Sequence, residues 1–429
     1  MKSRALVGYL AIAALLSGCG ALRGGDEEAR TGAVTTGVTR EPCPMAVDKN
    51  KGCIYLGTVS DLTSGPFAAL AVPITEAQKA FWRRVNQAGG IGGKYEVDVQ
   101  AYVRDNKYNP EVHRQVYNEI KDKVLGLAQT LGSPTTAAII GDLRANNVVS
   151  APASWTSAWE FEDVIIETGS NYCVESMNSV DYAMEVYKPK SVMAVHLAGD
   201  YGADAAAGAK AAAEKNGLTF TDVETPPGAN EQGRAINEIT KKKPDLVILT
   251  TGPADAATII GQAYAAGYRG RFIGTGPTWN PALLKSPAAQ AMKELYEQSS
   301  PGKPWDADTP GHKAMRDALG NVTPNDGYTS GWAWSYPMKA ALEKMVASGD
   351  ISRKGLLAAV KSLSTVDYEG MLPPEAGNFA GDPNAATFRQ TLINKVDETA
   401  PTGVRTVKDF FTGPTAQAYT MDGPCFEKL

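Results

Sequence analysis

The stretch VLGLAQTLGSPTT, residues 124–136, decides how this chain folds. Its apolar first part, residues 124–128, predicts a buried strand. A loop of small and polar residues follows at 132–136, and a helical stretch continues from it to about Leu143. A loop that opens a helix presents unpaired backbone N–H groups and the positive end of the helix dipole. The stretch therefore predicts a pocket for a carboxylate or another small anion at the C-terminal edge of a sheet.

The same order of strand, loop and helix recurs along the chain in two sets. Strands that alternate with helices in this way indicate parallel βαβ units. The first set has predicted strands at 54–60, 95–103, 124–128 and 147–151, with helices at 67–87 and 109–121. The second set has predicted strands at 191–197, 219–223, 245–251 and 271–274, with helices at 203–216, 230–241 and 254–266.

The last part of the chain departs from this alternation. A helix-rich return after two βα sets suggests that the chain crosses back between two lobes. The predicted fold class is therefore α/β, with parallel-sheet βαβ units in two lobes whose C-terminal edges surround a shared cleft. The predicted helices of this part are 308–319, 331–347 and 353–363, and its candidate strands are 388–396 and 404–411.

Length and composition limit the classes of function. A chain of 429 residues can bury two sizeable cores, and 43% hydrophobic with 21% charged residues is an ordinary globular balance. The net charge of -5 argues against a nucleic-acid surface. The sequence lacks GxSxG and HExxH motifs, and its three histidines are far apart. We therefore predict no enzyme, no metal site and no cofactor.

The N-terminus has the pattern of an export signal. Lys2 and Arg4 are basic, and residues 5–16 are apolar but too few for a comfortable transmembrane helix. The run LSGC at 16–19 resembles a bacterial lipoprotein signal, in which Cys19 is acylated and becomes the first mature residue. An ordinary signal peptide with a chance cysteine is the alternative. The prediction is an exported protein, lipid-anchored at the outer face of the cytoplasmic membrane or in the periplasm.

Four further cysteines suggest two disulfides, because the count is even and the chain is predicted to be exported. Three connectivities are possible. Cys43 and Cys53 flank a short loop that contains Pro and Gly, which favours a local bridge. Cys173–Cys425 then follows by elimination.

Four motifs in this order and spacing resemble type I periplasmic binding proteins. The resemblance points to the branched-chain amino-acid-binding (Leu/Ile/Val-binding-like) family of ABC transporter substrate-binding lipoproteins, over about residues 54–365. It implies two Rossmann-like lobes, a three-crossing hinge, closure on a small ligand and docking of a monomer on a membrane permease. The motifs are GTVSDLTSGPFAALA at 57–71, NQAGGIGGKYEV at 86–97, LGSPTT at 131–136 and GDYGADAA at 199–206.

The domain prediction combines the pattern with this resemblance. The expected parts are a signal peptide at 1–18, a lipidated cysteine and flexible tether at 19–53, a first lobe at 54–170 plus 300–370, and a second lobe at 171–299 plus 371–429.

The resemblance also implies a set of ligand-binding residues. The loop at Ser133, Pro134 and Thr135 would hold a carboxylate, and Tyr201 would close on the ligand from the second lobe. The other residues that the resemblance and the predicted cleft bring to the site are Phe67, Ala153, Ser154, Trp155, Thr275, Gly276, Trp279 and Tyr328.

One departure from the family bears on the ligand. Amino-acid binders usually hold the ligand's ammonium with an acidic residue after a late strand of the second lobe, but residues 274–279 read GTGPTW. A buried ammonium without a counter-charge is costly. Either Asp200, Asp255 or Asp326 substitutes, or the ligand is not an amino acid. Tryptophans near the predicted cleft favour an aromatic or larger apolar ligand.

The sequence is compatible with two functions. It has no motif for a third, an exported hydrolase. The first is a lipid-anchored receptor of an uptake transporter. The alternative is a ligand-sensing subunit of the same fold that signals to a membrane receptor. The sequence does not separate the two, because both use the same closure on the ligand.

Overall fold

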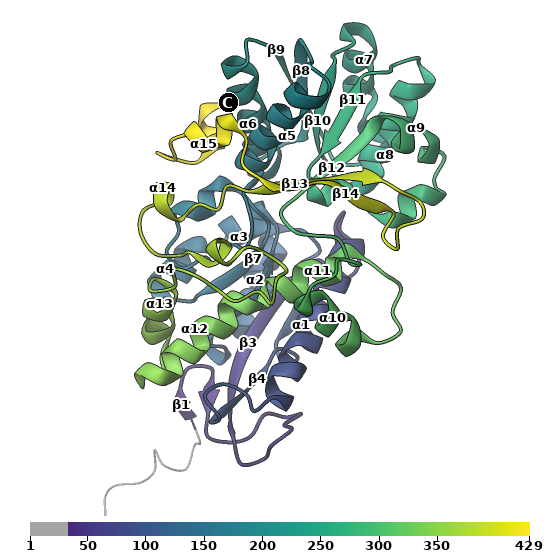
Figure 1. Cartoon of the computed structure of the whole chain (residues 1–429). Helices are drawn as coiled ribbons and strands as arrows, with labels where there is room; N and C mark the ends of the chain where they lie inside the picture. Colours follow the sequence, from purple (N-terminus) through teal and green to yellow (C-terminus); the bar gives the residue numbers. More distant parts are fainter. Residues whose placement is uncertain (1–32) are drawn as a thin grey trace, which may run out of the picture. The chain divides into compact units, whose positions relative to one another are not determined.

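Two sheets of seven strands each carry the fold, which confirms the predicted α/β class (Figure 1). The structure is a computed structural model that describes residues 33–429. The predicted signal segment and Cys19 lie outside the described residues. We term the first sheet and the helices packed on it the first lobe, and the second sheet with its helices the second lobe.

The first sheet is built around β3, which pairs in parallel with β4, β5 and β6. Its buried strands β3 and β6 are apolar along most of their length because both faces are covered. The strands of this sheet are β1 (Ala33–Thr35), β2 (Val38–Thr39), β3 (Gly52–Ser60), β4 (Tyr95–Asp98), β5 (Val103–Asp105), β6 (Gly126–Leu131) and β7 (Ser150–Ala153).

The second sheet has the order β14-β13-β12-β11-β10-β8-β9. Strands β8 to β12 are parallel, whereas β13 and β14 are antiparallel additions at one edge. The predicted strand at 271–274 coincides with β11. The strands are β8 (Ser191–Leu197), β9 (Thr219–Thr225), β10 (Leu246–Thr250), β11 (Arg271–Gly274), β12 (Tyr296–Ser300), β13 (Thr391–Val396) and β14 (Val404–Phe411).

Alternate residues of β10 show how the second sheet is covered on both faces. Val247 and Leu249 pack into one apolar cluster, with residues of α7, α8 and α9. Leu246 and Ile248 point to the opposite face and pack with residues of α5 and α6. The helices of this lobe are α5 (Tyr172–Val186), α6 (Asp200–Lys215), α7 (Gly233–Lys242), α8 (Pro253–Ala265), α9 (Ala289–Leu295) and α15 (Pro414–Ala418).

The first lobe is completed by helices from two distant parts of the chain. Helix α11 packs beside α1, although more than two hundred residues separate them in sequence (Figure 1). Helix α2 begins as predicted, since the Asn109 side chain accepts hydrogen bonds from Glu111 N and Val112 N. The early helices are α1 (Ala68–Gln87), α2 (Pro110–Ile120), α3 (Ser133–Ala137) and α4 (Ile140–Asn146); the late ones are α10 (Pro310–Leu319), α11 (Asp326–Ala333), α12 (Ser335–Ser348), α13 (Arg353–Val360) and α14 (Pro383–Ala386).

The chain crosses between the lobes three times. It leaves the first sheet after β7, returns to the first lobe after β12, and re-enters the second sheet at β13. Met371 and Phe388 pack in the core of the first lobe, C-terminal to the boundary at residue 370 that the sequence predicts. The last crossing therefore lies close to β13.

Residues 33–53 belong to the first lobe, although the sequence predicts them as part of a tether. Strand β2 pairs with β3. The loop between these two strands is fixed by hydrogen bonds from Val47 N and Asp48 N to the Glu96 carboxylate, at 2.8 and 2.7 Å. Gly37 has φ +73°, and a Cβ there would lie 2.0 Å from Leu125 N. The hairpin thus depends on glycine at this position.

Two disulfides join Cys43 to Cys53 and Cys173 to Cys425. The first closes a loop with a sequence separation of 10, next to β3. The second has a separation of 252 and ties the C-terminal segment to the first turn of α5. Both cysteines of the second bridge are fully buried.

Replacing Cys173 and Cys425 with alanine is expected to lower the free energy of unfolding more than replacing Cys43 and Cys53 in the same way. In the chain-entropy model the difference is roughly 3 kcal/mol, because the longer closed loop restricts the unfolded chain more. Urea unfolding of the two double variants, each serving as the control for the other, measures it. Equal losses would contradict this expectation.

Candidate functional site

A cavity of about 100 Å³, which we term the main cavity, lies between the two lobes. Most of its wall comes from loops that follow the C-terminal ends of strands in both sheets, as the arrangement of parallel strands predicts. Strand β12 and the helices α1, α3, α5, α6 and α11 supply the rest. The lining residues are Phe67, Leu70, Ile74, Tyr108, Leu131, Gly132, Ser133, Ala153, Ser154, Trp155, Tyr172, Tyr201, Gly276, Pro277, Trp279, Pro281, Gln298, Ser300, Pro301, Asn325, Asp326, Gly327, Ser330 and Trp334.

Ser133 provides the one hydroxyl in this wall, among the described residues, that is buried without a hydrogen-bond partner. The side chain is 1% exposed, and its Oγ makes no hydrogen bond. The preceding Gly132 has φ +97°, and a Cβ there would lie 2.5 Å from Thr135 Oγ1, so the tight turn into α3 requires glycine. No side chain caps the first N–H groups of α3. The Ser133 hydroxyl therefore lies at the uncapped start of α3, where Pro134 has no N–H group and the backbone donors are those of Ser133 and Thr135.

The helix after this loop differs from the sequence prediction. The stretch predicted to run to about Leu143 is divided into α3 and α4, which are separated at Ala138 and Ile139. Because α3 has only five residues, its dipole is small. Direct hydrogen bonds from Ser133 and the adjacent backbone are the stronger means of holding an anion here.

Aromatic side chains form most of the apolar wall. Three pairs of rings are in contact. Their ring centroids are 4.8 Å apart for Phe67 and Tyr108, 4.6 Å for Tyr172 and Tyr201, and 4.9 Å for Trp155 and Trp334. Phe67 of the first lobe also meets Tyr201 of the second at 6.1 Å, so rings of the two lobes touch across the cavity. Each such pair is worth about 0.5–1.5 kcal/mol beyond its buried area.

The Tyr201 hydroxyl is held by the second lobe. It donates to Thr251 O at 3.3 Å and lies 3.2 Å from Thr275 Oγ1. Burial raises the pKa of Tyr201 well above its usual value, so the phenol stays neutral. Tyr201 therefore offers the cavity mainly its ring.

The structure brings most of the predicted ligand-binding residues to the main cavity. Four lie outside its wall. The Thr135 hydroxyl donates to backbone carbonyls of its own loop, Tyr328 packs on Trp305 at 5.6 Å, Thr275 contacts Tyr201, and Pro134 lies within α3. Those that line the cavity are Phe67, Ser133, Ala153, Ser154, Trp155, Tyr201, Gly276 and Trp279.

Three aromatic lining residues carry no clear signal in the sequence. Tyr108 has φ +54° and lies in the loop after β5, so only the register of a three-residue strand places it. Tyr172 is on α5, a helix that the sequence does not predict. Trp334 lines the cavity, whereas Trp332, two residues earlier, is fully buried in the first core.

Asp326 is the one carboxylate in the described wall. It accepts a hydrogen bond from Trp305 N at 2.8 Å, and burial raises its pKa to about 6. The two other candidates for holding an ammonium lie elsewhere. Asp200 is at the start of α6, where burial raises its pKa to about 6, and Asp255 accepts from Gly228 N.

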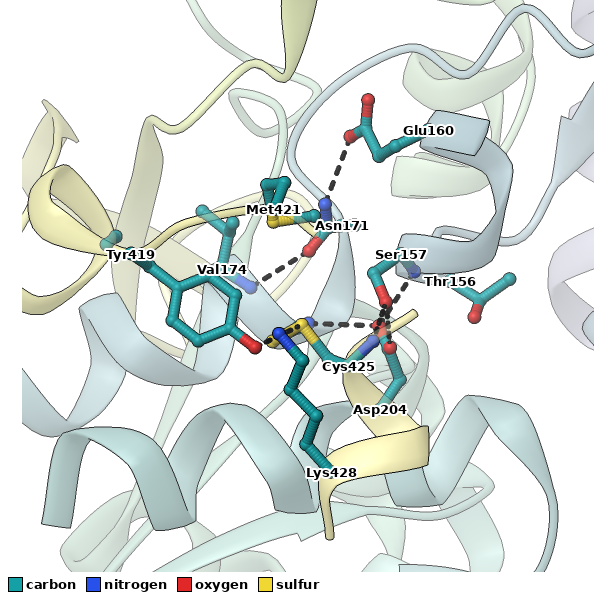
Figure 2. Close-up of a disulfide and its surroundings, with 12 residues drawn as sticks. Thr156, Ser157, Glu160, Asn171, Val174, Asp204, Tyr419, Met421, Cys425 and Lys428 are labelled. Atoms are coloured by element: carbon teal, nitrogen blue, oxygen red, sulfur yellow. Dashed lines mark hydrogen bonds between the residues drawn. A yellow bond between two sulfur atoms is a disulfide. The ribbon is translucent and has the colours of Figure 1, made fainter. Parts of the chain in front are cut away.

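A buried carboxylate joins the second lobe to the first crossing (Figure 2). Asp204 on α6 accepts hydrogen bonds from Ser157 N at 2.9 Å, from the Ser157 hydroxyl and from Cys173 N at 3.2 Å. Cys425 N in turn donates to the Ser157 hydroxyl at 2.7 Å. Burial raises the pKa of Asp204 to about 7, even though these hydrogen bonds favour its ionised form.

Comparisons with known proteins agree with the α/β fold. Residues 54–400 match a family model described as periplasmic binding protein. A fatty acid ABC transporter substrate-binding protein from Thermomonospora curvata is 30% identical in sequence, with a TM-score of 0.80, and the match covers 90% of this chain and 97% of that one.

More distant relatives share the fold. A branched-chain amino acid ABC transporter protein from Thermus thermophilus with bound valine is 17% identical, with a TM-score of 0.71, over 86% of this chain and 98% of that one. A Leu/Ile/Val-binding protein homolog from Brucella melitensis is 23% identical over 308 residues, which are 69% of this chain and 80% of that protein.

Two further properties concern residues 33–429. No helix in this range is long and apolar enough to span a membrane. No group of three or more His, Cys, Asp or Glu side chains in the same range could hold a metal ion.

The buried carboxyl groups predict how stability depends on pH. Burial raises the pKa values of Asp204 and Glu175 to about 7 and those of Asp200 and Asp326 to about 6. It lowers the pKa values of His113 and His312 to about 3 and 4, which acts in the opposite direction. Because the carboxyl groups are more numerous, these groups together bind more protons in the folded chain than in the unfolded chain between about pH 4 and 7. The free energy of unfolding is therefore expected to fall as the pH rises through this range, by up to about 1.4 kcal/mol per pH unit for each such group. Urea unfolding at a series of pH values measures it.

Asp204→Asn is expected to reduce this slope between about pH 5 and 7. Asp397→Asn is the control, since hydrogen bonds from Thr399 and Arg405 lower the pKa of Asp397 to about 2 and its titration lies below that range. A stability that rises with pH between 5 and 7, or an unchanged slope in Asp204→Asn, would contradict the assignment.

Proposed function

The chain belongs to the periplasmic binding protein family, a class of solute-binding receptors, and we propose that its ligand is an apolar molecule with a carboxylate. The carboxylate would lie on Ser133 and the uncapped N–H groups of α3. The apolar part would lie among the aromatic rings of the main cavity. Binding would hold the two lobes together, because the ligand contacts both.

The buried, unpartnered hydroxyl of Ser133 carries this proposal. A polar group buried without a partner costs about 1–3 kcal/mol, and a carboxylate oxygen accepting from it removes that cost. Hydrogen bonds to a charged acceptor are also stronger than those between neutral groups. The hydroxyl and the N–H groups beside it are all donors, which suits an anion.

The described wall offers an ammonium only one carboxylate, Asp326, and this favours an acid over an amino acid. Gly276 and Trp279 line the cavity after β11, and neither carries a charge. Asp326 is the remaining candidate, and one of its oxygens is already used by Trp305 N. The name of the Thermomonospora curvata relative, a fatty acid binder, supports a ligand without an ammonium. The valine bound to the Thermus thermophilus protein supports the amino-acid alternative, for which Asp326 would hold the ammonium.

The cellular role that we propose is uptake. The family works outside the cytoplasm with membrane permeases, and this chain would deliver its ligand as a monomer to such a permease, without catalysing a reaction. Cys19 would carry the lipid anchor. A ligand-sensing role for the same fold remains the second candidate.

A thermal-shift screen of the purified chain tests the ligand class. The panel holds aliphatic and aromatic carboxylates, amides of the same compounds, and aliphatic and aromatic amino acids. A ligand that binds only the folded form raises the melting temperature with the logarithm of its excess over Kd. Shifts with simple carboxylates but not with the matched amides are expected. Shifts with amino acids alone would overturn the proposal in favour of Asp326 as an ammonium site.

Ser133→Ala is expected to weaken binding of such a carboxylate about 10- to 100-fold, because one hydrogen bond to a charged group is lost. Isothermal titration calorimetry measures the change in Kd. Ser179→Ala is the matched control: Ser179 is equally buried, but its hydroxyl donates to Glu175 O at 2.8 Å within α5. An unchanged Kd in Ser133→Ala would remove Ser133 from the site.

A further inference from the structure

A second, smaller cavity of about 40 Å³ adjoins the main cavity. We term it the hinge chamber, because its wall includes Thr168 of the first crossing, Lys303 of the second and Asn394 of β13. The indole rings of Trp155 and Trp334, 4.9 Å apart, border both cavities. The residues that line both are Trp155, Gln298, Ser300, Pro301, Asp326, Ser330 and Trp334.

Two threonine hydroxyls of the hinge chamber are buried without a hydrogen-bond partner. Thr168 is 4% and Thr329 is 5% exposed, and the Oγ1 atom of each makes no hydrogen bond. The Tyr368 hydroxyl donates to Ala376 O at 3.1 Å and lies close enough to Thr168 for a weak interaction with its hydroxyl. Since an unpartnered buried hydroxyl is unfavourable, a bound group that supplies these partners would be stabilised in the chamber.

The other polar groups of the chamber are already used. Asn394 donates to Gln298 at 3.0 Å and accepts from Thr406 at 2.8 Å. The Ser300 hydroxyl donates to Gly302 O at 2.8 Å. Thr168 and Thr329 therefore differ from these polar neighbours, which already have hydrogen-bond partners.

The charges around the chamber disfavour an anion. Lys303 Nζ is paired with the Asp409 carboxylate at 2.9 Å, so it does not provide an uncompensated positive charge. Lys303 is the one basic side chain in the described lining of the chamber, so no free cation is available there to an anion. Threonine hydroxyls both donate and accept, which matches a hydroxyl, carbonyl or amide group.

We propose that the hinge chamber is a second subsite, which binds an uncharged hydrogen-bonding group at the far end of the ligand. This inference rests on the proposed function, in which the ligand's carboxylate lies on Ser133. The substrate class is then an elongated acid with an apolar middle section and a distal hydroxyl, carbonyl or amide group. A simple alkanoic acid would fill the main cavity and leave Thr168 and Thr329 unpartnered.

Two matched series of ligands test the subsite. Unbranched alkanoic acids and the corresponding ω-hydroxyalkanoic acids of increasing length are titrated into the purified chain by calorimetry. At the lengths that reach the hinge chamber, the ω-hydroxy acid is expected to bind about tenfold more tightly than the unsubstituted acid. The reason is that one additional buried hydrogen bond corresponds to about a tenfold gain in affinity. Shorter ω-hydroxy acids are expected to bind more weakly, because their hydroxyl is left among aromatic rings.

Thr329→Val and Thr168→Val replace a hydroxyl with a methyl group of similar size. Each is expected to reduce the tenfold advantage of the long ω-hydroxy acid while leaving the Kd of a short alkanoic acid within about twofold. Thr240→Val is the control, since the Thr240 hydroxyl donates to Ile236 O within α7, away from both cavities. Circular dichroism and the short-acid Kd show whether each variant is folded.

The outcomes separate the two proposals. If alkanoic acids bind but ω-hydroxy acids have no advantage at any length, the hinge chamber holds only water and the subsite is overturned, whereas the proposed function stands. An advantage that survives in both threonine variants would also overturn it. If neither series binds, the proposed function and the subsite fall together.

Discussion

The common direction of the parallel strands is the constraint on which the rest of this structure depends. In each lobe, parallel strands end at the same sheet edge, so loops that are far apart in sequence become neighbours. Phe67, Ser133 and Trp155 meet in the first lobe for this reason, and Tyr201 and Trp279 in the second. Because both edges face the same space, a ligand is surrounded by two independent sets of loops. The aromatic contact between Phe67 and Tyr201 then joins the sets directly.

The region between the lobes contains several polar groups whose burial is unfavourable in the protein alone. Ser133, Thr168 and Thr329 have hydroxyls without partners, and Asp204 and Asp326 have raised pKa values. Optimal packing of two lobes would use apolar residues at such positions. Their presence indicates that this interface favours recognition over stability, as is common for binding sites. The long-range disulfide and two large cores supply the stability elsewhere.

Sequence reasoning predicted the elements that have an apolar pattern and missed those that do not. Strand β11 and helix α2 follow their expected bounds closely, because an apolar run marks the strand and Asn109-Pro110 marks the helix start. Strand β12 was missed, since its buried residues Glu297 and Gln298 are polar. Helix α5 was missed because it is buried on nearly all sides and contains polar residues throughout, so it has no amphipathic period.

The residues of the site likewise divide into those that a sequence motif marks and those that no motif marks. The loop that opens a helix directly after a strand predicts Ser133, and the family resemblance of the GDYG motif predicts Tyr201; both line the main cavity. Tyr108 and Tyr172 depend on the register of a short strand and on the unpredicted helix α5, which a single sequence does not reveal. The hinge chamber could not be predicted at all, because its wall combines residues of the first two crossings with Asn394 of β13.

The three crossings have a consequence for how such a protein can change its specificity during evolution. Neither lobe corresponds to one uninterrupted stretch of sequence, since each is assembled from separated segments. A recombination event with a single breakpoint therefore never exchanges one complete lobe for that of a homologue. Such a recombinant would combine half of one interface with half of another, and the two halves of the site's wall would no longer match each other. Point substitutions at the strand ends, which leave the crossings intact, are the easier route to a new ligand.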